Sequence, residues 1–169
     1  MAYTIRGVEP ASSHQLAEME AKIGPSNFLR TMAHRPEGMR DFMRLYGDLM
    51  GPAALVDHRI REMVYLAVSR VNECAYCIRH HSRTALEAGI SQAELRYVET
   101  ENDSHFSMRE RAALQYAREL TRNASVGDDT RYRAQELFST DEIVELTMII
   151  GLANFTNRFN NGLAVQPES

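Results

Sequence analysis

Tryptophan is absent from this 169-residue chain, and no apolar run approaches the length of a membrane-spanning helix. The most apolar stretch, residues 143–155, is interrupted by Glu145 and Asn154 and is shorter than the roughly 20 residues that a bilayer requires. Residues 1–6 hold no apolar core of signal-peptide length. We therefore expect a soluble, cytoplasmic protein that has no membrane partner.

Basic residues are in the minority, with 19 Lys and Arg against 23 Asp and Glu, and the net charge is −4. This balance lacks the positive surplus that attracts nucleic acid, so we expect no nucleic-acid partner. The chain also shows no Pro/Ser-rich linker and no repeat at a fixed period. One domain over residues 1–169 is predicted, since this length is typical of a single core.

Cysteine is scarce, and the two cysteines lie three positions apart, as Cys74 and Cys77. Two thiols cannot form the disulfide framework of a small secreted domain. In a reducing compartment such a Cys-x-x-Cys pair indicates redox chemistry or half of a metal site. Any disulfide formed there should be transient.

Strand signals are missing as well, because no alternating β-branched run is joined to an Asn-Gly or Asp-Gly hairpin turn. Helix signals recur instead, and three capping boxes predict helix starts at Ser91, Ser107 and Ser139. The prediction is an all-α bundle of about seven or eight helices, with a loose tail after Ala164. Helices that are apolar on several sides favour a homo-oligomer.

The helix before the cysteines carries an apolar stripe that includes Ile60, Val64 and Ala67. Glu62 lies outside this stripe and close to Arg59 and Arg61, so periodicity alone predicts a solvated carboxylate. Residues 36–50 and 75–88 are also expected to be helical, with the Cys-x-x-Cys pair at the N-terminus of the second.

A helix N-terminus favours negative charge, so both thiols are placed where a thiolate is stabilised. His81 follows Cys77 by four residues and shares its helix face, where an imidazole can accept the thiol proton. This favours Cys77 as the activated thiol, although the spacing leaves open which of Cys77 and Cys74 attacks first. His80 points in another direction and is read as a surface or core residue.

Two other interpretations of the pair remain open from the residues alone. The cysteines could bind zinc together with His81 and one further ligand, although structural zinc sites usually combine two ligand pairs. They could also be two small buried side chains without chemistry. Our preferred expectation is a thiol site that needs neither metal nor organic cofactor.

The pattern Glu62-x11-Cys74-x2-Cys77-x3-His81 closely resembles the alkylhydroperoxidase D-like branch of the carboxymuconolactone decarboxylase family. The resemblance is firm over residues 55–89. It implies an all-helical protein that forms dimers, trimers or hexamers and reduces organic hydroperoxides or hydrogen peroxide. It also implies a dithiol reductant, on a lipoyl-bearing or thioredoxin-like protein.

The same resemblance implies a role for each residue of the pattern. Cys77 attacks the peroxide and becomes a sulfenic acid, and Cys74 supplies a proton and closes the disulfide. His81 and Glu62 form the relay that activates the thiols, so Glu62 is expected to be catalytic on family grounds. Tyr76 departs from the best-known members, which have a histidine immediately before the second cysteine.

Two further functions are compatible with family and motif. The thiols could belong to a non-enzymatic redox sensor or disulfide-exchange adaptor, in which oxidation changes contacts between subunits. Muconolactone decarboxylation names the wider family, but members with that activity typically lack the cysteine pair.

Overall fold

A computed structural model describes residues 5–168, and every regular element within this range is helical. The elements are η1 (Pro10–Ser12), α1 (His14–Ile23), α2 (Asn27–Met32), α3 (Pro36–Met50), α4 (His58–Val71), α5 (Ala75–Glu87), α6 (Gln92–Thr100), η2 (Asp103–His105), α7 (Met108–Asn123), α8 (Asp128–Leu137) and α9 (Thr140–Gly162). The all-α prediction is confirmed. Nine α-helices replace the expected seven or eight, because the short segments α2 and α8 are both helices.

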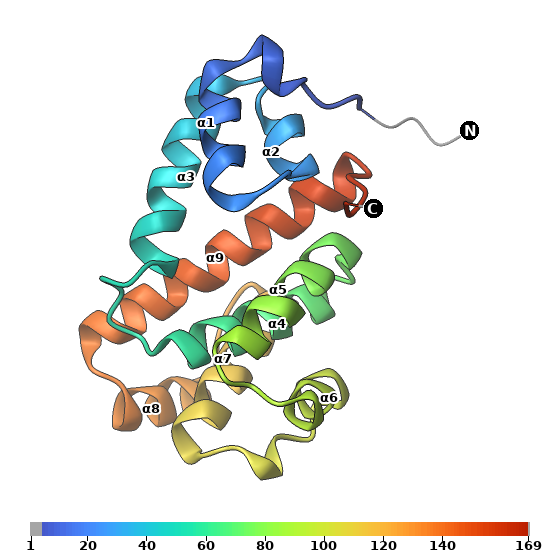
Figure 1. Cartoon of the computed structure of the whole chain (residues 1–169). Helices are drawn as coiled ribbons and strands as arrows, with labels where there is room; N and C mark the ends of the chain where they lie inside the picture. The colour runs from blue at the N-terminus through green and yellow to red at the C-terminus, as the bar shows by residue number, and fades with distance from the viewer. Residues whose placement is uncertain (1–4, 169) are drawn as a thin grey trace.

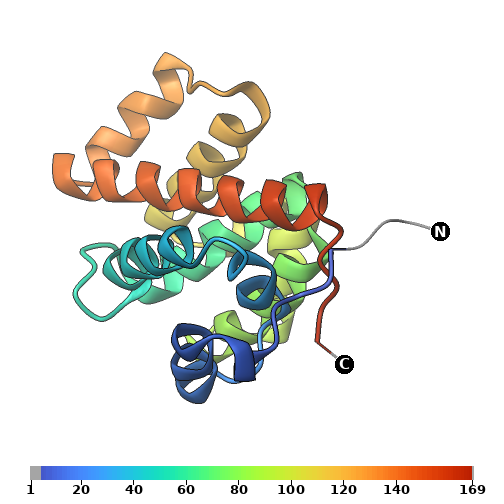
Figure 2. The ribbon, with the colours of Figure 1, turned by 90° about the horizontal axis from the view of Figure 1, so that it is seen from above.

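Helix α9 crosses the length of the molecule and separates two groups of helices (Figure 1). Helices α1, α2 and α3 lie on one side of it, and α4 to α7 lie on the other. In the view from above, α9 again runs between the α8 side and the N-terminal helices (Figure 2). Helix α4 contacts α5, α6, α7 and α9, so it is the centre of the second group.

Helix α4 is buried around its whole circumference over residues 60–69, not only along the predicted stripe. Val64 and Val68 face the core shared with α7 and α9, whereas Met63 and Leu66 face a second core formed with α5 and α6. The buried Arg61 donates from Nη1 to the carbonyl oxygens of Leu49 and Gly51 at the end of α3, whereas its Nε forms no hydrogen bond with the described residues. Burial on all sides is why periodicity failed to place the polar residues of this helix.

All three predicted capping boxes are present, because Ser91, Ser107 and Ser139 each cap a helix. The capping glutamates Glu94 and Glu110 also accept from the guanidinium of Arg59 on α4. Arg59 therefore joins the N-termini of α6 and α7 to the central helix, and local helix starts become part of the tertiary packing.

The chain after Ala164 is held in place, which corrects the expected loose tail. Val165 is buried, and the Glu168 carboxylate accepts from the backbone N–H of Asn27 at 2.7 Å. Asn27 also donates from its side chain to the Gln166 carbonyl at 3.0 Å. The tail thus packs on the start of α2, a long-range contact that sequence pattern does not encode.

No helix between residues 5 and 168 combines the length and apolarity needed to cross a membrane.

The buried packing of α4 gives a test of the fold. Leu66→Ala removes a side chain with no exposed surface and should lower the free energy of unfolding by about 2–5 kcal/mol in a denaturant titration. The control Leu55→Ala truncates a leucine that is 58% exposed and should stay within about 0.5 kcal/mol of wild type. Equal effects of the two substitutions would contradict this arrangement.

Candidate active site

A tight turn between α4 and α5 positions the two cysteines. Helix α4 ends at Val71, and Glu73 has a left-handed backbone with φ of +52°, which redirects the chain. The N–H of Cys74 donates to the Ser69 carbonyl at 3.0 Å, and Asn161 on α9 donates to the Asn72 carbonyl at 2.9 Å. This turn makes Cys74 the N-cap of α5, as the sequence predicted, and places Cys77 in the first turn.

The two thiols are reduced and in direct contact. Cys74 Sγ donates to Cys77 Sγ across 2.9 Å, and Cys74 Sγ accepts from the Cys77 N–H at 3.4 Å. Cys74 has no exposed surface, and Cys77 is 3% exposed. A pair held this close needs only a small movement to form a disulfide.

The contact between the two sulfurs shifts the pKa values of the two thiols in opposite directions. The hydrogen bond from Cys74 lowers the pKa of Cys77, and Asn160, His81 and Asn157 lower it further against the opposing effect of burial. The pKa of Cys74 is raised by the same hydrogen bond and by burial. Cys77 is therefore the thiol of the pair with the lowered pKa, in line with the preference that the spacing gave, and which cysteine attacks first stays a prediction.

Two amides on α9 complete the surroundings of Cys77. Asn160 Nδ2 donates to Cys77 Sγ at 3.3 Å, and Asn157 Nδ2 donates to Ser69 Oγ at 3.1 Å on the neighbouring side. Both side chains are buried. Asn160 was missed in the sequence, although two asparagines three positions apart in an apolar helix are a signal of a buried polar site.

His81 and Glu62 lie together behind the thiols. His81 Nδ1 lies 2.9 Å from Glu62 Oε2, and the imidazole stacks on the Tyr65 ring with centroids 3.7 Å apart. Thr84 donates to the same carboxylate oxygen at 2.5 Å, and His58 approaches the other oxygen at 3.6 Å. Neither His81 nor Glu62 is more than 4% exposed, so the solvated Glu62 that periodicity predicted is wrong and its placement beside His81 agrees with the resemblance.

The Glu62 carboxylate stays charged despite its burial. Burial alone would raise the pKa of Glu62, but the hydrogen bond and charge of His81 and the hydrogen bond from Thr84 outweigh it. The pKa of Glu62 is therefore below its usual value. Because Nδ1 faces this carboxylate, the other imidazole nitrogen of His81 points away from Glu62.

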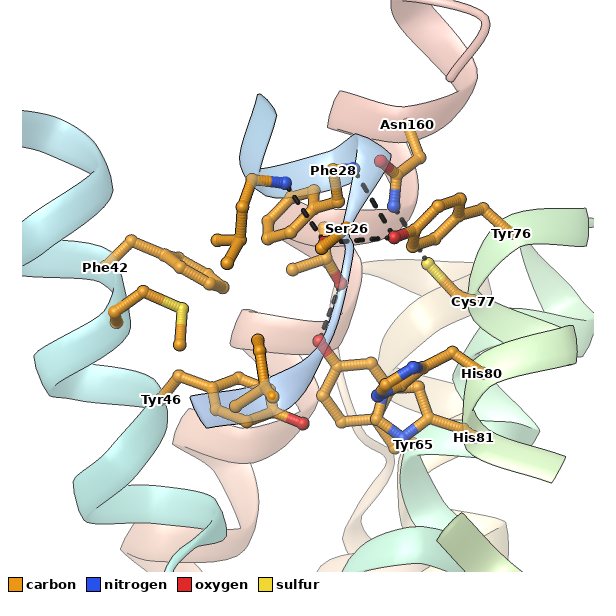
Figure 3. Close-up of a pocket in the computed structure, with 14 residues that line it drawn as sticks. Ser26, Phe28, Phe42, Tyr46, Tyr65, Tyr76, Cys77, His80, His81 and Asn160 are labelled. Atoms are coloured by element: carbon orange, nitrogen blue, oxygen red, sulfur yellow. Dashed lines mark hydrogen bonds between the residues drawn. The ribbon is translucent and has the colours of Figure 1, made fainter. Parts of the chain in front are cut away.

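Cys77 opens onto a cavity of about 240 Å³ between α3, α5 and α9 (Figure 3). The cavity is lined by Ile23, Ser26, Phe28, Leu29, Phe42, Met43, Tyr46, Tyr65, Tyr76, Cys77, His80, His81, Thr156 and Asn160. Cys74 does not line it. A ligand in this cavity would therefore meet the Cys77 sulfur first, in mainly apolar surroundings.

His80 also lines this cavity, and it is half-buried. Burial, followed by the nearby charges of His81 and Arg83, lowers the pKa of His80 to about 4. Its ring is therefore neutral near pH 7.

Tyr76, between the two cysteines, is an anchor and not a second base. Its hydroxyl donates to Glu168 Oε1 at 2.7 Å and accepts from the Phe28 N–H at 3.3 Å. The Ser26 hydroxyl lies 3.2 Å away. Burial raises the pKa of the phenol, so Tyr76 stays neutral and joins α5 to α2 and to the C-terminal tail.

Over residues 5–168, no group of three or more His, Cys, Asp and Glu side chains is arranged to hold a metal ion.

Comparisons with known proteins agree with this geometry. The sequence model of the carboxymuconolactone decarboxylase family matches residues 36–119. The uncharacterized protein YdfG of Bacillus subtilis (strain 168) is 29% identical over 128 residues, which cover 74% of this chain and 86% of that protein.

Two solved structures resemble the chain over most of its length. An Agrobacterium tumefaciens protein of unknown function, put forward as the antioxidant defence protein AhpD, is 26% identical with a TM-score of 0.76, covering 82% of this chain and 95% of that chain. The debrominase Bmp8 has a TM-score of 0.84 at 21% identity, covering 96% of this chain and 91% of that chain. The same fold therefore carries more than one chemistry.

The division of roles between the thiols predicts which one reacts. At pH 7, limiting iodoacetamide should alkylate Cys77 ahead of Cys74, because only the thiolate is a good nucleophile and only Cys77 faces the cavity. Peptide mass mapping at early times measures the ratio, and the denatured protein, in which both thiols are free, is the control. Faster labelling of Cys74 would contradict the assignment.

The buried Glu62 predicts a pH dependence of stability. Because its folded pKa is depressed, its stabilising contribution is complete above the ordinary pKa of 4.5 and is lost as pH falls through the folded value. Glu62→Gln should therefore flatten the fall in unfolding free energy below pH 4.5, by at most about 1.4 kcal/mol per pH unit. Denaturant titrations measure this slope, and Glu18→Gln, whose side chain is 61% exposed, is the control that should keep the wild-type slope.

Proposed function

Because the chain belongs to the carboxymuconolactone decarboxylase family, in its alkylhydroperoxidase D-like branch, we propose that it is a thiol-dependent peroxidase. The proposal rests on one observation. A thiolate-forming Cys77 faces an apolar cavity while the protonated Cys74 lies 2.9 Å behind it. An attacking thiolate and a resolving thiol are the two groups that peroxide reduction by cysteine requires.

In the first step, His81 accepts the proton of Cys77, and the Glu62 carboxylate stabilises the resulting imidazolium. The Cys77 thiolate then attacks the terminal oxygen of a hydroperoxide. The S–O bond forms as the O–O bond breaks, and the terminal oxygen keeps its hydrogen as a sulfenic acid. The leaving alkoxide takes the proton from His81 and departs as an alcohol, or as water from hydrogen peroxide.

In the second step, Cys74 attacks the Cys77 sulfur. The S–S bond forms, the S–O bond breaks, and the hydroxide combines with the Cys74 proton to leave as water. The peroxide is reduced by two electrons, and both electrons come from the thiol pair. Their short separation favours this condensation over further oxidation of Cys77.

An external dithiol must return the pair to its reduced state. Since Cys74 has no exposed surface and Cys77 is reached through the cavity, a slender dithiol fits better than a broad protein surface. A lipoyl arm meets this requirement, whereas a thioredoxin-like protein requires the helices to move. We therefore favour a lipoyl-type reductant.

A second candidate is reductive removal of bromide from a brominated aromatic compound. The aromatic lining of the cavity beside a thiolate supports it, and the debrominase Bmp8 shares the fold. The electrons of this reaction also balance. The two thiols are oxidised to a disulfide, and the carbon–bromine bond is replaced by a carbon–hydrogen bond as bromide and a proton leave. Bromide release from 2,3,4-tribromopyrrole, a ligand solved in complex with Bmp8, separates this candidate from peroxide reduction.

Peroxide consumption with dihydrolipoamide as reductant tests the proposal. Wild type should turn over cumene hydroperoxide repeatedly, Cys77→Ser should be inactive, and Cys74→Ser should stop after one equivalent. His81→Ala should be slower by about 10²–10⁴-fold, the usual contribution of an acid–base group. His14→Ala, at a side chain that is 86% exposed, should match wild type.

Two results would contradict the proposed peroxidase function. Full activity of Cys77→Ser would remove the attacking thiol from the mechanism. A single oxidation of wild type without turnover, despite reducible thiols, would instead identify the redox sensor.

A further inference from the structure

Asn157 and Asn160 lie one turn apart on α9, but only Asn160 has an amide atom without a hydrogen-bond partner among the described residues. Asn157 uses both ends of its amide, donating to Ser69 Oγ at 3.1 Å and accepting from Asn72 Nδ2 at 2.9 Å. Asn160 donates to Cys77 Sγ at 3.3 Å, and its buried Oδ1 accepts from none of the described residues. Leaving a buried carbonyl oxygen unpaired is costly, so such an atom points to a binding role.

The location of Asn160 supports that role. Asn160 lines the cavity in front of Cys77, whereas Asn157 does not. Its side chain is 97% buried, being only 3% exposed, and projects from α9 toward the sulfur with its oxygen on the Phe28 side (Figure 3). An acceptor thus lies directly beside the reacting sulfur.

A donor lies on the opposite wall. The Tyr46 hydroxyl projects from α3 toward Tyr65 and His81 (Figure 3) and forms no hydrogen bond with the part of the chain that the structure describes. The other two phenols of the cavity are occupied, because Tyr65 bonds to Thr156 at 2.7 Å and Tyr76 to Glu168 at 2.7 Å. Burial raises the pKa of Tyr46, so its hydroxyl remains a donor at every physiological pH.

We propose that Asn160 and Tyr46 form a polar clamp that orients a neutral organic hydroperoxide across the Cys77 sulfur. The terminal O–H donates to Asn160 Oδ1, which holds the terminal oxygen beside Sγ. Tyr46 donates to the second oxygen, the one that leaves. This inference rests on the proposed peroxidase function and specifies how its substrate is held.

The rest of the lining defines the organic group. Among residues 5–168, no Lys, Arg, Asp or Glu side chain lines the cavity, so a substrate carboxylate would be buried without an oppositely charged partner there. Phe28 and Phe42 pack edge to face with centroids 5.3 Å apart and offer aromatic contacts. A compact aromatic or branched group therefore fits best, and hydrogen peroxide has no group to occupy this end.

The clamp makes and breaks no covalent bond. During attack the terminal oxygen keeps the hydrogen that it donates to Asn160 and becomes the sulfenic hydroxyl. The second oxygen leaves with the proton from His81, while Tyr46 stabilises its developing negative charge.

The test compares Asn160→Ala and Tyr46→Phe with two matched controls at exposed positions, Asn123→Ala and Tyr132→Phe. The first readout is KM for cumene hydroperoxide, and the second is the Kd of its alcohol product, 2-phenyl-2-propanol, by calorimetry. Asn160→Ala and Tyr46→Phe should each raise both values about fivefold to tenfold, the worth of one hydrogen bond. Asn123→Ala and Tyr132→Phe should leave both within about twofold, and Asn160→Ala should in addition raise the pKa of Cys77 in a thiolate titration.

A further variant separates binding from folding. Asn160→Asp keeps an acceptor oxygen in the same place, so it should keep the wild-type Kd for the alcohol while raising the pKa of Cys77. Unchanged KM and Kd in either Asn160→Ala or Tyr46→Phe would contradict the clamp. Repeated peroxide turnover by wild type would still support the peroxidase function in that case. If wild type fails to turn over peroxide, the proposed peroxidase function is wrong. The Kd values of 2-phenyl-2-propanol for wild type and the variants then still test the clamp.

Discussion

The hydrogen bond between the two sulfurs is the interaction on which the site depends. By donating to Cys77, the Cys74 thiol lowers the pKa of Cys77, and the same hydrogen bond raises the pKa of Cys74. Two identical side chains thereby acquire different roles through geometry alone. The left-handed backbone of Glu73 and the N-cap position of Cys74 bring the two sulfurs into this contact.

Burial strengthens the contact because little water competes for it. The Glu62–His81 pair lies in the same dry interior, where an isolated carboxylate would be costly. Thr84 and His58 share the charge of Glu62, and the Tyr65 ring supports the imidazole. The central helix α4 therefore carries polar residues on a buried surface, at a position where a structural helix would place apolar ones.

The sequence predicted correctly those features that depend on interactions between residues close together in the chain. The capping boxes at Ser91, Ser107 and Ser139 satisfy backbone groups within a few residues, so their patterns predict helix starts without tertiary information. The Cys-x-x-Cys pair at a helix start was predicted for the same reason. Periodicity failed at Glu62, because it assumes one buried face and α4 has neighbours on every side.

The sequence by itself determined the all-helical fold and placed the two thiols and His81 on one helix, because these features depend on short-range spacing. Glu62 joined this set, and the family was identified, only through the resemblance. Only the tertiary structure decided that Asn160 contacts Cys77 and that Tyr76 is an anchor tied to Glu168. Those features join α5 to residues more than eighty positions away, on α9 and in the tail. Hydrogen bonds over such separations exist only once the helices have packed, so no local pattern records them.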